Sequence, residues 1–278
     1  MGIEIRPLSD VMAAEAVGVN LKTGVSPSER DALRQAITDH LVLCIRGQDL
    51  APTELAEASS LFGEPKTFVL RNDRIEDAPE VSIVSNRPPL LGGKPLVQAK
   101  HWHTDDSYLA EPATLTLLHA VTLPVVGGDT EFINCYMVLD ALPPNLRGRV
   151  DGLRAVHKYL SRRNESWVAK RSGEEEDETP DVDHPMIRTH PLSGRISLYI
   201  NPNRIDHILG WDEEASDALL DPLYEFAFQP WFQYRHNWQP GDLVIWDNRC
   251  TMHRANADYD LTQPRVMHRV MLEGEIPQ

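Results

Sequence analysis

A short run of metal-binding residue types stands near the middle of the chain, at His101-Trp102-His103-Thr104-Asp105-Asp106. On a β-strand, residues two apart share a face, so His103 and Asp105 can point at one ion. An imidazole together with a carboxylate suits a divalent metal such as Fe(II). His101 has the same parity and is a competing ligand. The run therefore predicts two ligands of one metal centre, and we prefer His103 and Asp105.

A third ligand stands far along the chain, at His253. The apolar residues 243–246 predict a strand, and the polar residues 247–249 predict a turn that carries the chain toward His253. Two histidines and one carboxylate on one face of an octahedron leave three positions open. This arrangement is the facial triad of non-haem Fe(II) oxygenases, which can hold a bidentate cosubstrate and dioxygen together.

Two arginines, Arg265 and Arg269, stand four residues apart on a predicted strand, and this spacing places them on one face. A guanidinium binds a carboxylate as a fork. A diacid cosubstrate that chelates the metal through a keto-acid end would place its far carboxylate on such an arginine. A threonine hydroxyl would complete the site, and residues 127–132 supply Thr130. The alternative is that both arginines are paired surface charges.

Four motifs that contain these residues occur in order along the chain, and together they resemble the TauD/TfdA family of Fe(II)- and 2-oxoglutarate-dependent dioxygenases. The resemblance runs from about residue 3 to residue 273. The motifs are Trp102-His103-Thr104-Asp105, Gly127-Gly128-Asp129-Thr130, Gly241-Asp242-Leu243-Val244-Ile245-Trp246-Asp247-Asn248-Arg249 with His253, and Arg265-Val266-Met267-His268-Arg269.

The resemblance implies a role for each matched residue. His103, Asp105 and His253 match the iron ligands, and Thr130 and Arg265 match the residues that hold the distal carboxylate of 2-oxoglutarate. Dioxygen would be the second cosubstrate. The resemblance also implies a mainly β fold with flanking helices, built on a double-stranded β-helix (jelly-roll) core, and a homo-oligomer, either a dimer or a tetramer.

The substrate is expected to be a small organic anion: a sulfonate, a sulfate ester, or an aryloxy or other carboxylate. Arg269 matches a family arginine that lies by the substrate anion, and Lys100 and Asn201 are further candidates for the pocket wall. Two other classes of function stay open. One is a non-catalytic jelly roll that binds a metal or a ligand, and the other is a metal-dependent hydrolase that uses the same ligands.

Apolar spacing and capping residues indicate the surrounding elements. Helices are expected over residues 26–40, 52–62 and 212–228, and strands over residues 41–45, 114–119, 196–200 and 243–246. A loop rich in Pro and Gly over residues 86–100 is a candidate lid. An acidic stretch over residues 172–183 predicts a solvated, mobile insertion. No composition shift suggests a linker, so we expect a single domain over residues 1–278.

Composition excludes several classes of protein. Lys and Arg number 27 against 42 Asp and Glu, and the formal net charge of -15 opposes binding to nucleic acid or to an anionic membrane. Three cysteines without a CxxC pair argue against zinc ribbons and disulfide scaffolds. The first residues show no secretory leader, and no apolar run approaches the roughly 20 residues that span a bilayer. These features predict a cytoplasmic protein.

Overall fold

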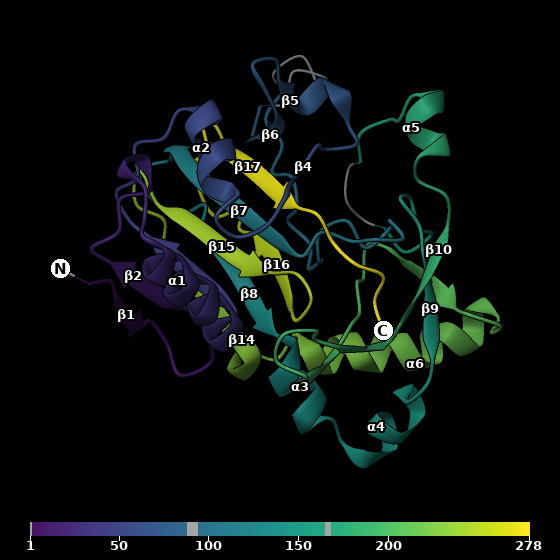
Figure 1. Cartoon of the computed structure of the whole chain (residues 1–278). Coiled ribbons are helices and arrows are strands. Elements are labelled where there is room, and N and C mark those ends of the chain that lie inside the picture. The colour runs from purple at the N-terminus through teal and green to yellow at the C-terminus, as the bar shows by residue number, and fades with distance from the viewer. Residues whose placement is uncertain (1, 88–93, 165–167) are drawn as a thin grey trace.

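The main sheet contains most of the strands in this computed structural model, which describes residues 2–87, 94–164 and 168–278 (Figure 1). Apart from the parallel pair β2–β3, neighbouring strands of the sheet are antiparallel. Its described strands follow the order β1 (Glu4–Pro7), β2 (Ala14–Val17), β3 (Val42–Ile45), β15 (Leu243–Asp247), β7 (Leu115–Thr122), β17 (Val266–Leu272), β6 (Ala78–Ser85) and β5 (Arg74–Ile75), and β4 (Pro65–Lys66) also pairs with β17.

A smaller antiparallel sheet faces the main sheet and is formed by β14 (Gln233–His236), β8 (Thr130–Asn134) and β16 (Thr251–Ala255). Apolar side chains from the two sheets share one core, in which Phe132 of β8 meets Trp246 of β15 with ring centroids 5.5 Å apart. Alternation along each strand sends every second side chain into this core. The candidate ligand His253 lies on β16, at the edge of this core.

Two helices cover the outer face of the main sheet (Figure 1). The first, α1 (Pro27–His40), begins with a capping box in which the side chains of Ser26 and Glu29 bond each other's backbone N–H groups. The second, α2 (Pro52–Ser59), packs on β6 and β17. Both helices bury their apolar stripes against Leu43, Ile245 and Val270 of the sheet, and they fix the strands that carry the candidate site.

The remaining elements form a second apolar core beside the smaller sheet. Its helices are α3 (Cys135–Ala141), α4 (Pro144–Val150) and α6 (Glu213–Ala227), and its strands are β9 (Arg154–His157), β10 (Val182–Pro185), β11 (Ile187–Thr189), β12 (Ile196–Leu198) and β13 (Ile205–Ile208). A short helix, α5 (Gly173–Asp177), and the 3-10 turns Leu21–Thr23, Arg71–Asp73 and Pro230–Phe232 complete the described elements.

The expected fold class, mainly β with flanking helices, matches the observed elements, and the expected helices and strands form within a few residues of their predicted ends. The structure differs in the acidic stretch 172–183, which forms α5 and the start of β10. Glu175 is buried there, because its carboxylate accepts hydrogen bonds from the backbone N–H groups of Arg71 and Ser172. In the described part of the chain, no helix has the length and apolar character needed to cross a membrane.

Candidate active site

Three side chains of ligand type meet at one place: His103, Asp105 and His253, with candidate ligand atoms all within 4.8 Å of one another. The Nε2 atoms of His103 and His253 lie 3.8 and 3.7 Å from the Asp105 carboxylate oxygens. These separations are too long for hydrogen bonds, but they fit ligands that share one ion at about 2.1 Å. The three residues therefore form a plausible donor set for a single divalent metal.

The strand expected at residues 101–106 is reduced to one bridge. His103 pairs with His253 through two backbone hydrogen bonds, of 3.0 and 2.7 Å, and the chain then enters a turn. Asp106 has φ 52°, so the backbone bends directly after Asp105. The shared direction of His103 and Asp105 therefore comes from a bridge followed by a bend, and not from strand alternation.

Buried hydrogen bonds orient the carboxylate of Asp105. Thr116 on β7 donates to Asp105 Oδ2 at 2.7 Å, and Asn248 Nδ2 donates to the Thr116 hydroxyl at 2.8 Å. Trp246 Nε1 in turn donates to Asn248 Oδ1 at 3.1 Å. On the other side, His103 Nδ1 lies 2.9 Å from the carbonyl of His101. Donation to this carbonyl leaves the lone pair of His103 Nε2 free for a metal.

Burial keeps the two imidazoles neutral, as metal binding requires. It is the main cause that lowers the pKa of His103, and it lowers the pKa of His253 to about 3, with His103 as the next cause. For Asp105, burial alone would raise the pKa. The nearby His253, Arg269 and His103 outweigh burial, and the pKa of Asp105 lies below its ordinary value. The two histidines are thus neutral and Asp105 is an anion, which are the protonation states that metal binding requires.

Thr130 and Arg265 line the same open cavity of about 570 Å³ as the three candidate ligands. Arg265 is buried, and its Nε donates to the carbonyl of Gly128 at 3.0 Å. Its Nη2 is buried without a hydrogen-bond partner among the described residues, and burial lowers its pKa. The hydroxyl of Thr130 accepts a hydrogen bond of 3.0 Å from Trp238 Nε1. A buried guanidinium with an unpartnered N–H beside an oriented hydroxyl is suited to bind a carboxylate.

A family model described as "Taurine catabolism dioxygenase TauD, TfdA family" matches residues 4–271. The chain belongs to this family.

Relatives with described activities extend over nearly the whole chain. The alpha-ketoglutarate-dependent 2,4-dichlorophenoxyacetate dioxygenase of Cupriavidus pinatubonensis is 31% identical over 280 residues, and the match covers 97% of each chain. The alpha-ketoglutarate-dependent sulfate ester dioxygenase of Pseudomonas putida is 31% identical over 285 residues, which cover 99% of this chain and 91% of the relative.

Solved structures of the TauD/TfdA family confirm the jelly-roll expectation. A crystal structure of a taurine dioxygenase from Burkholderia xenovorans superposes with a TM-score of 0.84 at 32% identity, and the match covers 100% of this chain and 91% of that one. The structure of AAD-2 in complex with Mn(II) and N-oxalylglycine also gives a TM-score of 0.84, at 30% identity, with 100% of this chain and 99% of that one covered.

Arg269, the TauD/TfdA arginine expected near the substrate, lies between the two cavities that adjoin the candidate ligands, and lines both. Its Nη1 is 3.9 Å from Asp105 Oδ1, and its Nε donates to the Ser82 hydroxyl at 3.2 Å. Its guanidinium carbon lies 4.5 Å from the centre of the Phe68 ring. A cation held this firmly in the cavity wall can contact a bound anion.

The structure does not bring Lys100 to these cavities. Ala99 faces the cavity and has φ 57°, and the chain direction changes there, so that Lys100 is exposed and lines a separate cavity with Trp102 and Arg254. The competing ligand His101 lines that second cavity as well. Neither residue is in the cluster of His103, Asp105 and His253.

Asn201 is fully buried and lines neither cavity beside the candidate ligands. Its Nδ2 donates to the carbonyl of Thr104 and to the hydroxyl of Ser107, both at 2.8 Å. These two hydrogen bonds hold the turn that carries Asp105 in place, and they use both N–H groups of the Asn201 amide. The structure thus places this predicted substrate residue against the turn at Thr104 and not in the wall of either cavity.

The candidate lid is described only at its two ends, and residues 88–93 lie outside the described residues. At one end, Asn86 accepts a hydrogen bond of 3.0 Å from the backbone N–H of Arg265. At the other end, Val97, Gln98 and Ala99 line the cavity of the candidate ligands. The ends of this segment therefore border the site.

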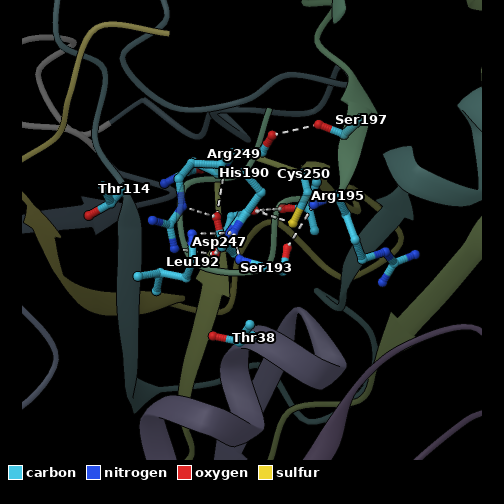
Figure 2. Close-up of polar contacts among 12 residues, drawn as sticks. Thr38, Thr114, His190, Leu192, Ser193, Arg195, Ser197, Asp247, Arg249 and Cys250 are labelled. Atoms are coloured by element: carbon cyan, nitrogen blue, oxygen red, sulfur yellow. Dashed lines mark hydrogen bonds and ion pairs between the residues drawn. The ribbon is translucent and has the colours of Figure 1, made fainter. Parts of the chain in front are cut away.

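A buried ion cluster supports the turn that leads to His253 (Figure 2). Arg249 Nη2 lies 2.6 Å and His190 Nε2 lies 3.0 Å from the same Asp247 carboxylate oxygen. The Thr251 hydroxyl donates to the Asp247 carbonyl at 2.7 Å. The sequence predicted the turn at Asp247, Asn248 and Arg249. It did not predict the contact with His190, because the residues around His190 give no sign that it lies beside this turn.

Proposed function

We propose that the protein is an Fe(II)- and 2-oxoglutarate-dependent dioxygenase that hydroxylates a small organic anion and converts 2-oxoglutarate to succinate and CO2. The single observation that carries this proposal is one cavity that holds both a His-Asp-His cluster and a carboxylate-binding pair, Thr130 and Arg265. The relatives named above are alpha-ketoglutarate-dependent dioxygenases, which supports the same reading.

Each residue has a defined task in this proposal. His103, Asp105 and His253 would hold the iron on one face, and the iron, when bound, supplies the chemistry that activates dioxygen. Arg265 would bind the distal carboxylate of 2-oxoglutarate through its unpartnered Nη2, and the Thr130 hydroxyl would orient that carboxylate. Thr116 keeps the carboxylate of Asp105 aligned.

The substrate class follows from the relatives and from the charge of the cavity wall. The relatives act on an aryloxy acid and on sulfate esters, according to their names. All of these substrates are small anions, and Arg269 lines the cavity where such an anion would lie. We infer that the substrate is a sulfonate, a sulfate ester or a carboxylate, placed with a C–H bond toward the metal.

A metal-dependent hydrolase would explain less of the site, and a ligand sensor differs from the dioxygenase in forming no succinate. A metal-dependent hydrolase needs a metal and a water molecule but has no use for a second carboxylate anchor. Here Arg265 is buried with an N–H that lacks a protein partner, which is costly unless a ligand pairs with it. This arrangement favours the dioxygenase over the hydrolase.

Succinate formation tests the proposal. The Fe(II)-loaded protein is given 2-oxoglutarate, air and a panel of sulfonates, sulfate esters and aryloxy acids, and succinate is measured against His253→Ala. We expect at least one acid to stimulate succinate release and oxygen uptake in the wild type only. Product formation without oxygen and without 2-oxoglutarate would instead identify a hydrolase.

The proposal also covers the domain organisation, the oligomeric state and the cellular location of the enzyme. The family match over residues 4–271 supports one dioxygenase domain that takes in the whole chain. We further propose a homo-oligomer located in the cytoplasm, as the family resemblance and the composition suggest. Gel filtration with light scattering tests the oligomer, and cell fractionation tests the location.

A further inference from the structure

Arg204 is a cation in the wall of the second cavity beside the candidate ligands, and it forms no ion pair with a carboxylate of the described residues. It lines an open cavity of about 930 Å³ together with His103, Asp105 and Arg269. None of the ion pairs among the described residues includes Arg204, and no carboxylate accepts a hydrogen bond from it. In a chain of net charge -15, a guanidinium left without a carboxylate calls for an explanation.

Packing holds the Arg204 side chain in place. Its guanidinium carbon lies 4.9 Å from the ring centre of Tyr108 and 5.2 Å from that of Tyr159, and Nη1 donates to the Tyr159 carbonyl. The two rings also meet each other edge to face, with centroids 5.1 Å apart. These contacts use one N–H group and leave Nε and Nη2 without a hydrogen-bond partner among the described residues. The fork is thus oriented in advance and open to a ligand.

Arg269, the other arginine of this cavity, differs from Arg204 because carboxylates lie near its guanidinium. Its Nη1 is 3.9 Å from Asp105. Burial raises the pKa of Asp73, another carboxylate of the cavity wall, and the charge of Arg269 opposes that rise. The positive charge of Arg269 is therefore partly balanced by protein carboxylates, whereas Arg204 forms no ion pair among the described residues.

Arg204 also stands close to the metal-binding side chains. It lines the same cavity as His103 and Asp105, and Asn203, the preceding residue, lines that cavity beside it. An acid that contacts Arg204 would consequently remain within reach of the cluster of His103, Asp105 and His253. A cation farther out on the surface would act only as a general attractant.

We propose that Arg204 binds the acidic group of the substrate and is the residue that selects an anion over a neutral molecule of the same shape. This inference rests on the proposed function, since it names a residue that recognises the substrate of that site. Charge-assisted hydrogen bonds from an oriented guanidinium are among the strongest polar contacts available. Loss of the Arg204 charge should weaken binding of the acid far more than it slows the chemical step.

A purely structural role for Arg204 makes a different prediction. In that case the residue would only tie the loop at Tyr159 to β13, and its replacement would lower stability without changing the preference for an acid. Arg171 offers a matched control, because its guanidinium packs 4.3 Å from the same Tyr159 ring but does not line the cavity. Arg204→Gln and Arg171→Gln therefore perturb the same tyrosine and differ in contact with the cavity.

Binding is measured first, without turnover. Calorimetry on the protein loaded with Zn(II) and 2-oxoglutarate uses 2,4-dichlorophenoxyacetate, hexyl sulfate and pentane-1-sulfonate, each with a neutral analogue such as the amide or the alcohol. We expect the acids to bind more tightly than their analogues, Arg204→Gln to weaken acid binding by about 10- to 100-fold, and Arg204→Lys to restore part of it. Arg171→Gln should bind the acids as the wild type does.

Equal acid binding in Arg204→Gln and Arg171→Gln would overturn the inference, as would the absence of any acid binding to the wild type. Steady-state kinetics with Fe(II) then add a second readout: the KM for the acid should rise in Arg204→Gln while kcat and the KM for 2-oxoglutarate stay near wild type. Acid binding that depends on Arg204 without succinate formation would contradict the proposed dioxygenase but leave this inference standing.

Discussion

His103 and His253, 150 positions apart in the chain, donate a backbone hydrogen bond to each other's carbonyl, at 3.0 and 2.7 Å. The pair joins the loop after the candidate lid to β16 of the smaller sheet. Their ring centroids are consequently only 4.2 Å apart. The spacing of the two imidazoles is therefore set by the backbone, and the orientation of Asp105 is set by side-chain hydrogen bonds.

Thr116→Val should weaken metal binding without unfolding the protein. Valine keeps the shape of the side chain but removes the 2.7 Å hydrogen bond to Asp105. Loss of a hydrogen bond that orients a metal ligand typically costs 10- to 100-fold in affinity. Metal affinity is measured by competition with a chelator, with Thr114→Val as the control, since the Thr114 hydroxyl donates to the Glu273 carbonyl and not to a candidate ligand. Equal affinities in the two variants would refute the orienting role of Thr116.

Arg265→Gln should raise the concentration of 2-oxoglutarate needed for half-maximal turnover by about 10- to 150-fold. The variant removes the charge that the distal carboxylate would bind, and charged hydrogen bonds contribute about 1.5–3 kcal/mol. Initial rates against 2-oxoglutarate concentration provide the measurement. If the requirement is unchanged, the carboxylate anchor is elsewhere, and Arg269 becomes the first candidate.

Gly128→Ala should produce a similar but smaller defect through Arg265. Gly128 has φ 74°, where an L-residue is strained, and an added Cβ would lie 3.1 Å from Cγ of Pro124 and 3.3 Å from both Cδ and Nε of Arg265. The arginine must then shift away from its position at the Gly128 carbonyl. Gly148→Ala is the control, because a Cβ there meets nothing within 4 Å. The KM for 2-oxoglutarate should rise in the first variant only.

Stability should fall in mild acid, partly because of His184. Burial is the main cause that lowers the pKa of His184 to about 4, whereas the unfolded chain binds this proton near pH 6.5. Between these values the unfolded state holds more protons, so stability is lost as the pH falls from about 6.5 toward 4. One such group contributes at most about 1.4 kcal/mol per pH unit. Urea unfolding of His184→Gln should depend less steeply on pH than that of His40→Gln.

Asp247→Asn should be strongly destabilising. The Asp247 carboxylate is fully buried between Arg249 and His190 (Figure 2), and removal of its charge leaves the buried Arg249 guanidinium without its paired carboxylate. Such losses cost about 3–5 kcal/mol. Urea denaturation measures the effect, with Asp181→Asn as a control in a solvent-exposed ion pair with Lys158. Similar midpoints for the two variants would show that the buried cluster contributes little.

Residue types and motif order were sufficient to find the core of the candidate site, because a His-Asp-His set with Thr130 and Arg265 has few other uses. Contact partners were harder to predict. Thr116 and Trp238 lie on separate segments, and only the pairing of strands and the packing of loops bring them to Asp105 and Thr130. A linear sequence shows the hydrogen-bonding capacity of such residues but not their neighbours.

The residues predicted to contact substrate show the same limit of prediction from sequence. Lys100 stands next to the histidine cluster in sequence, yet the backbone at Ala99 sends it to another cavity. Arg204 follows the predicted pocket residue Asn201 by three positions and reaches the cavity, while the Asn201 side chain is buried in the turn at Thr104. Local backbone direction decided both outcomes, and side-chain type did not.

The visible spectrum of the protein with Fe(II) and 2-oxoglutarate, recorded without oxygen, tests the central claim most directly. We expect a weak metal-to-ligand charge-transfer band in the wild type, no band in His253→Ala, and half-saturation of the band at a much higher 2-oxoglutarate concentration in Arg265→Gln. Wild-type protein that binds iron but shows no band at saturating 2-oxoglutarate would contradict the assignment of this cavity to an iron- and 2-oxoglutarate-dependent reaction.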